Sequence, residues 1–231
     1  MKILIADAFD AKLPQRLAAF GDVSGDMATL GEAEVLLVRS KTKVNAELVA
    51  GAPKLKLVIR GGVGMDNVDK KLCAEKGIKA VNTPKASSVA VAEMAKAIMV
   101  AIPARLIEAH TSMKEGKFLK NELKRTELFK KILGLVGAGA IATEVARRAE
   151  AFGMKVIAFD PFLKEHPVAE LVGSLEELAA QADVISLHTP LTDETKGMVN
   201  TALIARMKDG VILVNTGRGK CVVEEDLVDG G

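Results

Sequence analysis

The sequence contains 231 residues, of which 49% are hydrophobic, and its formal charge at pH 7 is +2. A chain of this size can bury a sizeable core in one large domain or in two small ones. Because the charge is nearly balanced, it gives no reason to expect a nucleic acid or an anionic membrane surface as a partner.

The apolar segments of the chain are short. The first apolar run, residues 3–5, is followed within two residues by Asp7, which is typical of a buried strand and not of a signal peptide. No stretch approaches the roughly 18 uninterrupted apolar residues of a membrane span. Cys73 and Cys221 show no close pairing pattern, which favours a reducing compartment. We therefore expect a soluble, cytoplasmic protein.

Short apolar runs alternate with longer helical patterns along nearly the whole chain. A first series of predicted buried parallel strands comprises residues 3–6, 35–38, 57–59 and 79–81. A second series comprises residues 132–136, 156–159, 184–187 and 211–215. The alternation predicts an α/β fold whose parallel sheets are covered by helices on both faces, and the two series predict two domains.

The segment from residue 88 to about residue 131 separates the two series. It begins with an apolar helical run, residues 89–102, which could kink at Pro103. Residues 114–131 are strongly polar, with seven Lys or Arg and three Glu. The charge run indicates a solvated connecting arm, and steering of an anionic substrate is the alternative interpretation.

A glycine-rich loop follows the first strand of the second series. Gly137 and Gly139 belong to a G-x-G-x-x-A pattern that lies between a strand and an amphipathic helix, with Ala142 as its third small residue. Such a loop allows backbone N–H groups at the helix N-terminus to hold a pyrophosphate. Alone the pattern is weak, because glycines also mark ordinary strand–helix turns.

Asp160 strengthens this interpretation. It ends the next strand, 21 residues after Gly139. A carboxylate there can accept hydrogen bonds from the adenosine ribose 2′-OH and would repel a 2′-phosphate, so the pair predicts NAD and not NADP. The alternative is an ordinary loop aspartate before Pro161.

In open α/β sheets the ligand lies outside the carboxyl ends of the strands, so the residues at those ends are candidates for the site. The second series offers His188-Thr189-Pro190 and Thr216-Gly217-Arg218-Gly219; the first offers Arg39-Ser40, the run from Arg60 to Asn67, and Asn82-Thr83-Pro84. Gly61, Gly62 and Gly64 can expose N–H groups to a carboxylate, and the forks of Arg60 and Arg218 can hold a carboxylate or phosphate. Both arginines could instead be solvated loop cations.

On these residues the chain resembles the D-2-hydroxyacid dehydrogenase family, and most of all its D-3-phosphoglycerate dehydrogenase branch. The resemblance is carried by LLVRSKTKV, VIRGGVGMDNVD, GIKAVNTPKASSVAVAE, the stretch from RTELFKK to VIAFDP, ISLHTPLTDET and MKDGVILVNTGRG. These motifs occur in the order and at the spacing of the family, and they cover nearly the whole chain from about residue 35.

The resemblance implies two doubly wound parallel-sheet domains with the active site between them. Residues 1–97 would form a flavodoxin-like substrate-binding domain, and residues 98–231 a Rossmann NAD-binding domain that is incomplete at its C-terminal end. It also implies a homodimer acting on a small 2-hydroxy or 2-keto acid, and we expect no metal site.

Individual roles also follow from the resemblance. Arg218 would bind the substrate carboxylate and polarise the carbonyl, Val63, Gly64 and Met65 would hold the carboxylate through backbone N–H groups, and Arg60 would contact a substrate phosphate. The residues implied to contact the cofactor are Thr83, Gly137, Gly139, Ala140, Ile141, Asp160, His188, Thr189, Pro190, Thr216 and Gly217.

The sequence departs from the family pattern in a few places. The usual Arg and third Gly of the glycine loop are Ala140 and Ala142, and a usual Asn is Ser87. These changes could weaken cofactor binding without excluding it, because backbone groups hold most of the pyrophosphate.

The proton donor of the family, a histidine backed by a glutamate, would fall beyond residue 231, as would an aspartate that anchors the nicotinamide carboxamide. We do not expect His110, His166 or His188 to replace the donor. The sequence is therefore interpreted as part of a longer enzyme, and residues 1–231 alone are expected to show no appreciable dehydrogenase turnover.

Three functions are compatible with these residues. The leading hypothesis is NAD-dependent oxidation of 3-phosphoglycerate to 3-phosphohydroxypyruvate at the entry to serine biosynthesis. A glyoxylate or hydroxypyruvate reductase is the alternative within the same class. An NAD-sensing module, resembling the transcriptional corepressors of the family, is the alternative from a different class.

Overall fold

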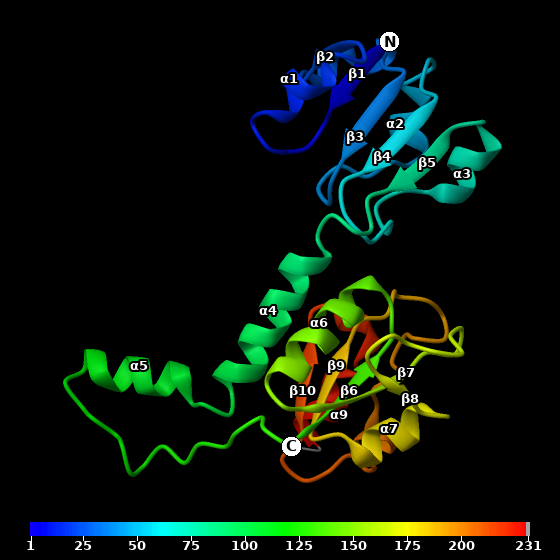
Figure 1. The fold of residues 1–231 in the computed structure, drawn as a ribbon. Helices are drawn as coiled ribbons and strands as arrows, with labels where there is room; N and C mark the ends of the chain where they lie inside the picture. Colours follow the sequence, from blue (N-terminus) through cyan, green and yellow to red (C-terminus); the bar gives the residue numbers. More distant parts are fainter. Residues whose placement is uncertain (230–231) are drawn as a thin grey trace. The chain divides into compact units, whose positions relative to one another are not determined.

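The computed structural model, which describes residues 1–229, divides between Ser87 and Ser88 into two units (Figure 1). Each unit is built on one five-stranded sheet in which every neighbouring pair of strands is parallel. The predicted α/β class is therefore confirmed. Within the described residues no helix is both long enough and apolar enough to cross a membrane.

The first unit has the strand order β2-β1-β3-β4-β5, which is the flavodoxin-like order. Its strands are β1 (Lys2–Ile5), β2 (Asp22–Ser24), β3 (Val35–Val38), β4 (Leu57–Arg60) and β5 (Lys79–Asn82). Its helices are α1 (Leu13–Leu17), η1 (Met27–Glu32), α2 (Ala46–Ala50) and α3 (Lys70–Glu75). All four residues of the central strand β3 are buried, as expected for a strand covered on both faces.

The sequence did not predict β2. This strand has only three residues, of which the first is exposed and the other two are half-buried. It lies at the edge of the sheet and therefore carries neither a continuous apolar run nor a clear alternation. Pairing with β1 fixes it in place, since Lys2 lies opposite Asp22 in the register.

The second unit has the strand order β10-β9-β6-β7-β8. Its strands are β6 (Ile132–Val136), β7 (Lys155–Phe159), β8 (Glu170–Leu171), β9 (Val184–Leu187) and β10 (Ile212–Asn215). Its helices are α4 (Ser88–Ala101), α5 (Leu106–Lys114), α6 (Ala140–Ala151), α7 (Leu175–Gln181), α8 (Thr201–Ile204), η2 (Gly219–Cys221) and α9 (Glu224–Asp229). The order reverses at β6, so the ends of β6 and β9 form the switch point of a Rossmann sheet.

Apolar clusters cover both faces of this sheet. On one face α4 and α6 pack over β6, where Met99 and Val145 join Leu133 and Leu135. On the other face Leu178 of α7 joins the cluster that contains Val136, Ile157, Ile185 and Leu203. The first strand, β6, is thus buried on both sides, and its carboxyl end is held rigidly where the glycine loop begins.

Helix α4 belongs to the second unit, so the division falls earlier than the boundary expected after residue 97. Figure 1 shows α4 running beside α6. A guanidinium nitrogen of Arg148 on α6 lies 3.7 Å from a carboxylate oxygen of Glu93 on α4. The Lys96 ammonium of α4 lies 3.6 Å from the Met154 sulfur and 4.0 Å from the centre of the Phe152 ring. These contacts attach α4 to the second unit although the helix follows directly on the first unit in sequence.

The possible kink at Pro103 is wrong, because the helix ends two residues before this proline. Helix α4 stops at Ala101, Arg105 adopts a left-handed backbone conformation with φ of 52°, and α5 begins at Leu106. Proline cannot continue the hydrogen-bonding of a helix interior. Within its own unit α5 leads away from the sheet and buries only Ser112 (Figure 1).

Candidate functional site

The glycine loop is fixed at the carboxyl end of β6 by backbone geometry. Gly137 has φ of +83°, a conformation that favours glycine, and a Cβ there would lie 3.0 Å from the carbonyl oxygen of His188 and from Cγ2 of Thr189. The Gly137 N–H donates to the carbonyl of Phe159 at 2.9 Å. The loop therefore requires glycine both for its turn and for the close approach of the loop after β9.

Gly139 is the N-cap of α6, and a Cβ on it would meet no atom within 4 Å. The first N–H groups of a helix have no partner within the helix, and the helix dipole favours an anion there. The twelve-residue helix α6 thus presents free donors beside open space. These features fit a pyrophosphate that is held by backbone, although the first turn carries no cationic side chain.

Asp160 contacts the glycine loop directly. One carboxylate oxygen accepts the N–H of Ala138 at 3.0 Å, and the other accepts the N–H of Phe162 at 3.0 Å. A carboxylate has about four acceptor positions, so Asp160 can still accept hydrogen bonds from a ribose hydroxyl. The side chain therefore shapes the loop in addition to the binding role that the sequence predicted.

The loop after β9 lies against the glycine loop. The His188 N–H donates to the carbonyl of Val136 at 2.8 Å, and its Nε2 lies 2.9 Å from the hydroxyl of the fully buried Ser186. Burial lowers the pKa of His188 to about 4, so the ring is neutral at physiological pH. The predicted residues His188, Thr189 and Pro190 thus lie beside Gly137, but this half-buried imidazole is a neighbour of the loop and is not suited to be a proton donor.

The loop that carries Arg218 is shaped by Asn215, which the sequence analysis missed. The Asn215 side-chain oxygen accepts the N–H of Gly217 at 2.9 Å, and its amide nitrogen donates to the carbonyl of Arg218 at 3.0 Å. Asparagine next to a glycine-containing turn commonly makes such bonds, so the Asn-Thr-Gly sequence carried a usable signal. Arg218 is half-buried, and its guanidinium donates to the carbonyl of Gly217 at 3.3 Å.

This loop also reaches the loop after β9. A Cβ on Gly217 would lie 3.5 Å from the carbonyl oxygen of Thr189. The buried Cys221 thiol lies 3.9 Å from the Thr189 hydroxyl and 4.0 Å from the carbonyl of Pro190. Thr216 has a buried hydroxyl oxygen with no hydrogen-bond partner within residues 1–229. A buried hydroxyl of this kind fits a site whose ligand supplies the missing bond.

The structure therefore brings together all the predicted cofactor residues of the second unit. They lie on three adjoining loops at the carboxyl ends of β6, β9 and β10, with Asp160 at the end of β7: Gly137, Gly139, Ala140, Ile141, Asp160, His188, Thr189, Pro190, Thr216 and Gly217. Adjacent parallel strands end at the same edge of the sheet, which is why residues so far apart in sequence meet there.

The predicted residues of the first unit form a second group, at the carboxyl ends of β4 and β5. Gly62 has φ of +139°, and a Cβ there would lie 1.7 Å from a guanidinium nitrogen of Arg60. The Gly62 N–H donates to the Thr83 hydroxyl at 2.9 Å, and the amide of Asn82 donates to the carbonyl of Val63 at 2.6 Å. Gly62 is thus the residue that allows the Arg60 side chain to lie against its own loop.

Val63, Gly64 and Met65 differ in exposure. Val63 is 37% exposed, whereas Met65 is half-buried and packs against the core of its unit. Thr83, which the sequence assigned to the cofactor, lies in this first unit and uses its hydroxyl to accept from Gly62. The backbone of the 61–65 loop, rather than its side chains, is therefore the part suited to bind a carboxylate.

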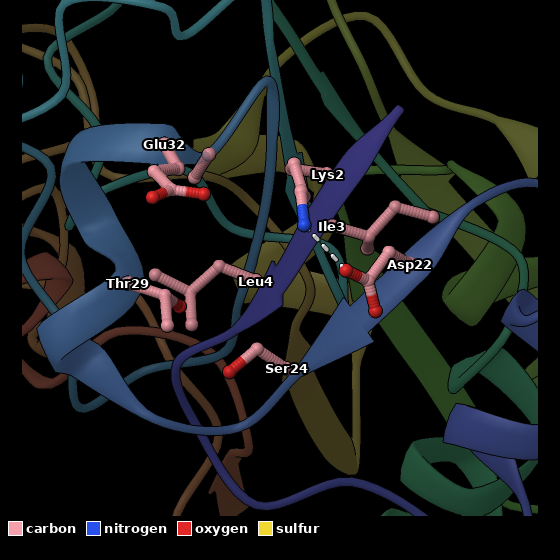
Figure 2. Close-up of a pocket in the computed structure, with 8 residues that line it drawn as sticks. Lys2, Ile3, Leu4, Asp22, Ser24, Thr29 and Glu32 are labelled. Atoms are coloured by element: carbon pink, nitrogen blue, oxygen red, sulfur yellow. Dashed lines mark hydrogen bonds and ion pairs between the residues drawn. The ribbon is translucent and has the colours of Figure 1, made fainter.

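A further pocket of the first unit lies beside β1, β2 and η1 (Figure 2). In this close-up the Lys2 ammonium points toward the carboxylate of Asp22, with which it forms an ion pair. Its lining does not include any of the predicted site residues. Residues 1–229 contain no cluster of His, Cys, Asp or Glu that could hold a metal ion.

The chain is also similar to proteins of a known family. The family model described as "D-isomer specific 2-hydroxyacid dehydrogenase, NAD binding domain" matches residues 96–230. A hydroxypyruvate reductase of Thermotoga maritima is 47% identical over 203 residues, covering 88% of this chain and 66% of that protein. A D-3-phosphoglycerate dehydrogenase of Methanocaldococcus jannaschii is 38% identical, covering 99% of this chain and 46% of that protein.

A solved structure with a bound cofactor also resembles this chain. The D-lactate dehydrogenase of Aquifex aeolicus, crystallised with NAD and lactic acid, is 34% identical and superposes with a TM-score of 0.86. That comparison covers 98% of this chain and 72% of the other. The chain thus spans just under two thirds of the hydroxypyruvate reductase and less than half of the phosphoglycerate dehydrogenase.

Proposed function

The chain belongs to the D-isomer specific 2-hydroxyacid dehydrogenase family, whose cofactor is NAD, and we propose that it acts in an oxidoreductase of this family. The reaction would interconvert a D-2-hydroxy acid and its 2-keto acid. The observation that carries the proposal is the meeting of the glycine loop with Asp160, the 188–190 loop and the Arg218 loop at one sheet edge. NAD, when bound, accepts or supplies the hydride of this reaction.

The residues that would hold NAD follow from that arrangement. Backbone N–H groups from Gly139 to Ile141 would bind the pyrophosphate, and Asp160 would accept from the adenosine ribose. Residues 188–190, Thr216 and Gly217 would line the rest of the cofactor, with Thr83 as a contact from the first unit. A negative charge at Asp160 would disfavour the 2′-phosphate of NADP, which supports a preference for NAD.

The substrate would be held by arginines and backbone donors. Arg218 would bind the carboxylate with two parallel hydrogen bonds and polarise the carbonyl that is reduced. The N–H groups of Val63, Gly64 and Met65 would add donors for the same carboxylate. Arg60 would bind a phosphate on the far end of the substrate.

We propose 3-phosphoglycerate as the substrate, which would place the protein in serine biosynthesis. The phosphoglycerate dehydrogenases that it resembles align with almost the whole chain, and Arg60 offers a cation for the phosphate. Hydroxypyruvate is the second candidate, because the Thermotoga maritima relative with 47% identity is named a hydroxypyruvate reductase. NAD sensing without catalysis is the third possibility.

Steady-state kinetics on the protein in its natural length test these alternatives. Arg60→Ala is expected to lower kcat/KM for phosphohydroxypyruvate by roughly tenfold or more, since it removes a charge-assisted contact. The kcat/KM for hydroxypyruvate should stay within about threefold of the wild-type value. Arg16→Ala, an exposed arginine on α1, is the matched control. An unchanged preference for the phosphorylated substrate would show that Arg60 is not its anchor, and NAD binding without any turnover would favour the sensing role.

None of the three histidines is suited to act as the proton donor of the reaction. His110 is exposed on α5, and burial keeps His188 neutral beside Ser186. His166 uses both ring nitrogens in hydrogen bonds of its own unit. We therefore do not assign the donor to a histidine of residues 1–231.

We also propose a homodimer and a cytoplasmic location. Exposed apolar side chains occur in the turn after α4, on α5 and on the segment that follows: Ile102, Leu106, Ile107, Met113 and Phe118. A surface of this kind supports association with a second copy, which the molar mass in solution would test. The two free cysteines, both buried, are compatible with a reducing compartment.

A further inference from the structure

His166 makes hydrogen bonds that define its protonation state. It lies in the irregular loop between β7 and β8, and its Nδ1 accepts the backbone N–H groups of Val168 at 3.3 Å and Ala169 at 2.9 Å. A nitrogen that accepts from two N–H groups cannot itself carry a proton. The proton of the neutral ring is therefore on Nε2.

The protonated nitrogen faces the first turn of α6. Nε2 lies 2.9 Å from the Thr143 hydroxyl oxygen, so the imidazole donates to that hydroxyl. The hydroxyl in turn donates to the carbonyl of Gly139 at 3.1 Å. The result is a chain of two hydrogen bonds from the loop to Gly139, the N-cap of the helix.

The surroundings of His166 disfavour its cationic form. Burial is the main cause that lowers its pKa, and the nearby Arg147 of α6 lowers it further, while Asp160 acts in the opposite direction. Arg147 is itself paired with Glu144 at 3.0 Å. Protonation of Nδ1 would also place its N–H against the backbone N–H groups of Val168 and Ala169, so that three donors would face one another. Both the local geometry and the nearby charges therefore favour the neutral ring.

The loop that contains His166 is attached to the glycine-loop region at two points. At its start, Asp160 accepts from Ala138; further along, His166 donates to Thr143. We propose that His166 is a positioning residue for NAD, which holds the loop after β7 against the first turn of α6 so that Asp160 and the N-terminal N–H groups of α6 keep a fixed separation. This inference rests on the proposed placement of the pyrophosphate at Gly139 and of the ribose at Asp160.

A role confined to loop stability makes a different prediction. If His166 only supported the loop fold, its replacement would lower the melting temperature without a specific effect on NAD affinity. If the bond to Thr143 positions the cofactor groups, breaking it from either side should weaken NAD binding by the same amount. Breaking it from both sides should then cost no more than breaking it once.

The test is a double-mutant cycle on NAD⁺ affinity, measured by calorimetry at neutral pH. His166→Asn retains an oxygen that can replace Nδ1 as acceptor but cannot reach Thr143, and Thr143→Val removes the hydroxyl with little change of shape. Each variant, and the double variant, is expected to bind NAD⁺ about two- to tenfold more weakly than the wild type, as for the loss of one hydrogen bond. Thr143→Ser should restore the affinity lost in Thr143→Val, and His110→Asn on exposed α5 is the matched control.

Two outcomes would overturn the inference. One is full additivity of the two losses, and the other is unchanged affinity in both single variants. Failure of the wild type to bind NAD⁺ would instead overturn the proposed cofactor site itself, so the two failures are distinguishable. Nitrogen NMR of the imidazole provides a readout that does not depend on binding: a proton on Nε2 alone supports the inference, and a proton on Nδ1 overturns it.

Discussion

At the scale of single residues, the polar side chains of the second unit serve two purposes at once. Asp160 and Asn215 stand where a ligand is expected, yet their closest partners are backbone groups of the neighbouring loops. These hydrogen bonds form within residues 1–229 without a ligand, so the two side chains determine the shape of the loops before any ligand binds. Their replacement is therefore expected to affect both structure and binding.

Two substitutions of Asp160 separate these purposes. Asp160→Asn removes the charge but keeps one acceptor, so the preference for NAD over NADP is expected to narrow by roughly tenfold. Asp160→Ala also leaves the N–H groups of Ala138 and Phe162 without their acceptor, which should lower the free energy of unfolding by about 1–3 kcal/mol.

Calorimetric affinities for both dinucleotides and urea unfolding measure the two effects. Glu176→Gln, an exposed acid on α7, is the control that changes charge without touching the loop. A preference that stays constant in Asp160→Asn would mean that its charge does not select the cofactor.

At the scale of elements, the amino-terminal ends of three strands are joined by one aspartate. Asp183, which precedes β9, accepts the N–H of Ile132 at 2.8 Å and the Lys208 ammonium at 3.2 Å through its side chain. Its own N–H and C=O bond to Ile132 and Ile212. Burial alone would raise the pKa of Asp183, but the hydrogen bonds from Ile132 and Lys208 outweigh it and lower the pKa below its usual 3.8.

This arrangement predicts a pH-dependent contribution to stability. Because the pKa is lower in the folded state, the stabilisation is complete above about pH 3.8 and is lost as the pH falls through the folded-state pKa. Asp183→Asn is expected to lower the free energy of unfolding by about 1–2 kcal/mol at pH 7. The difference from the wild type should shrink as the pH falls below about 3.8, the usual pKa of an aspartate.

Urea unfolding of both proteins over a pH series measures the difference. Asp209→Asn, an exposed acid nearby in sequence, should show no such dependence. A difference that persists unchanged in acid would show that the carboxylate charge is not what joins the strands.

At the scale of the whole molecule, cofactor binding and turnover are expected to be separable. The three loops suited to NAD all belong to the second unit, whereas no histidine of residues 1–231 is suited to supply the proton. Purified residues 1–231 should therefore bind NADH but show no appreciable reduction of hydroxypyruvate, phosphohydroxypyruvate or glyoxylate.

Calorimetry and the loss of NADH absorbance measure the two quantities on one sample. Measurable reduction of any of the three acids by residues 1–231 would mean that one of the described groups donates the proton after all.

The sequence by itself determined the α/β class, the main strands of both sheets, the glycine loop and its acidic partner. These features depend on local patterns, namely short apolar runs, a glycine turn before an amphipathic helix, and a carboxylate at a strand end. Strands β2 and β8 were missed because edge strands of two or three residues carry too little pattern. The end of α4 at Ala101, before Pro103, and the start of α5 at Leu106 were missed because the choice between a kink and a break is made by the surroundings.

Only the tertiary structure decided how the loops contact one another. The approach of Thr189 to Gly137, the bond from Ala138 to Asp160 and the contact of His166 with Thr143 all depend on how parallel strands and chain segments many residues apart are packed. Hydrogen-bond partners across such distances leave no periodic signal in the sequence. The sequence therefore determined which residues are available to a dinucleotide, and the packed sheet decided which of them meet.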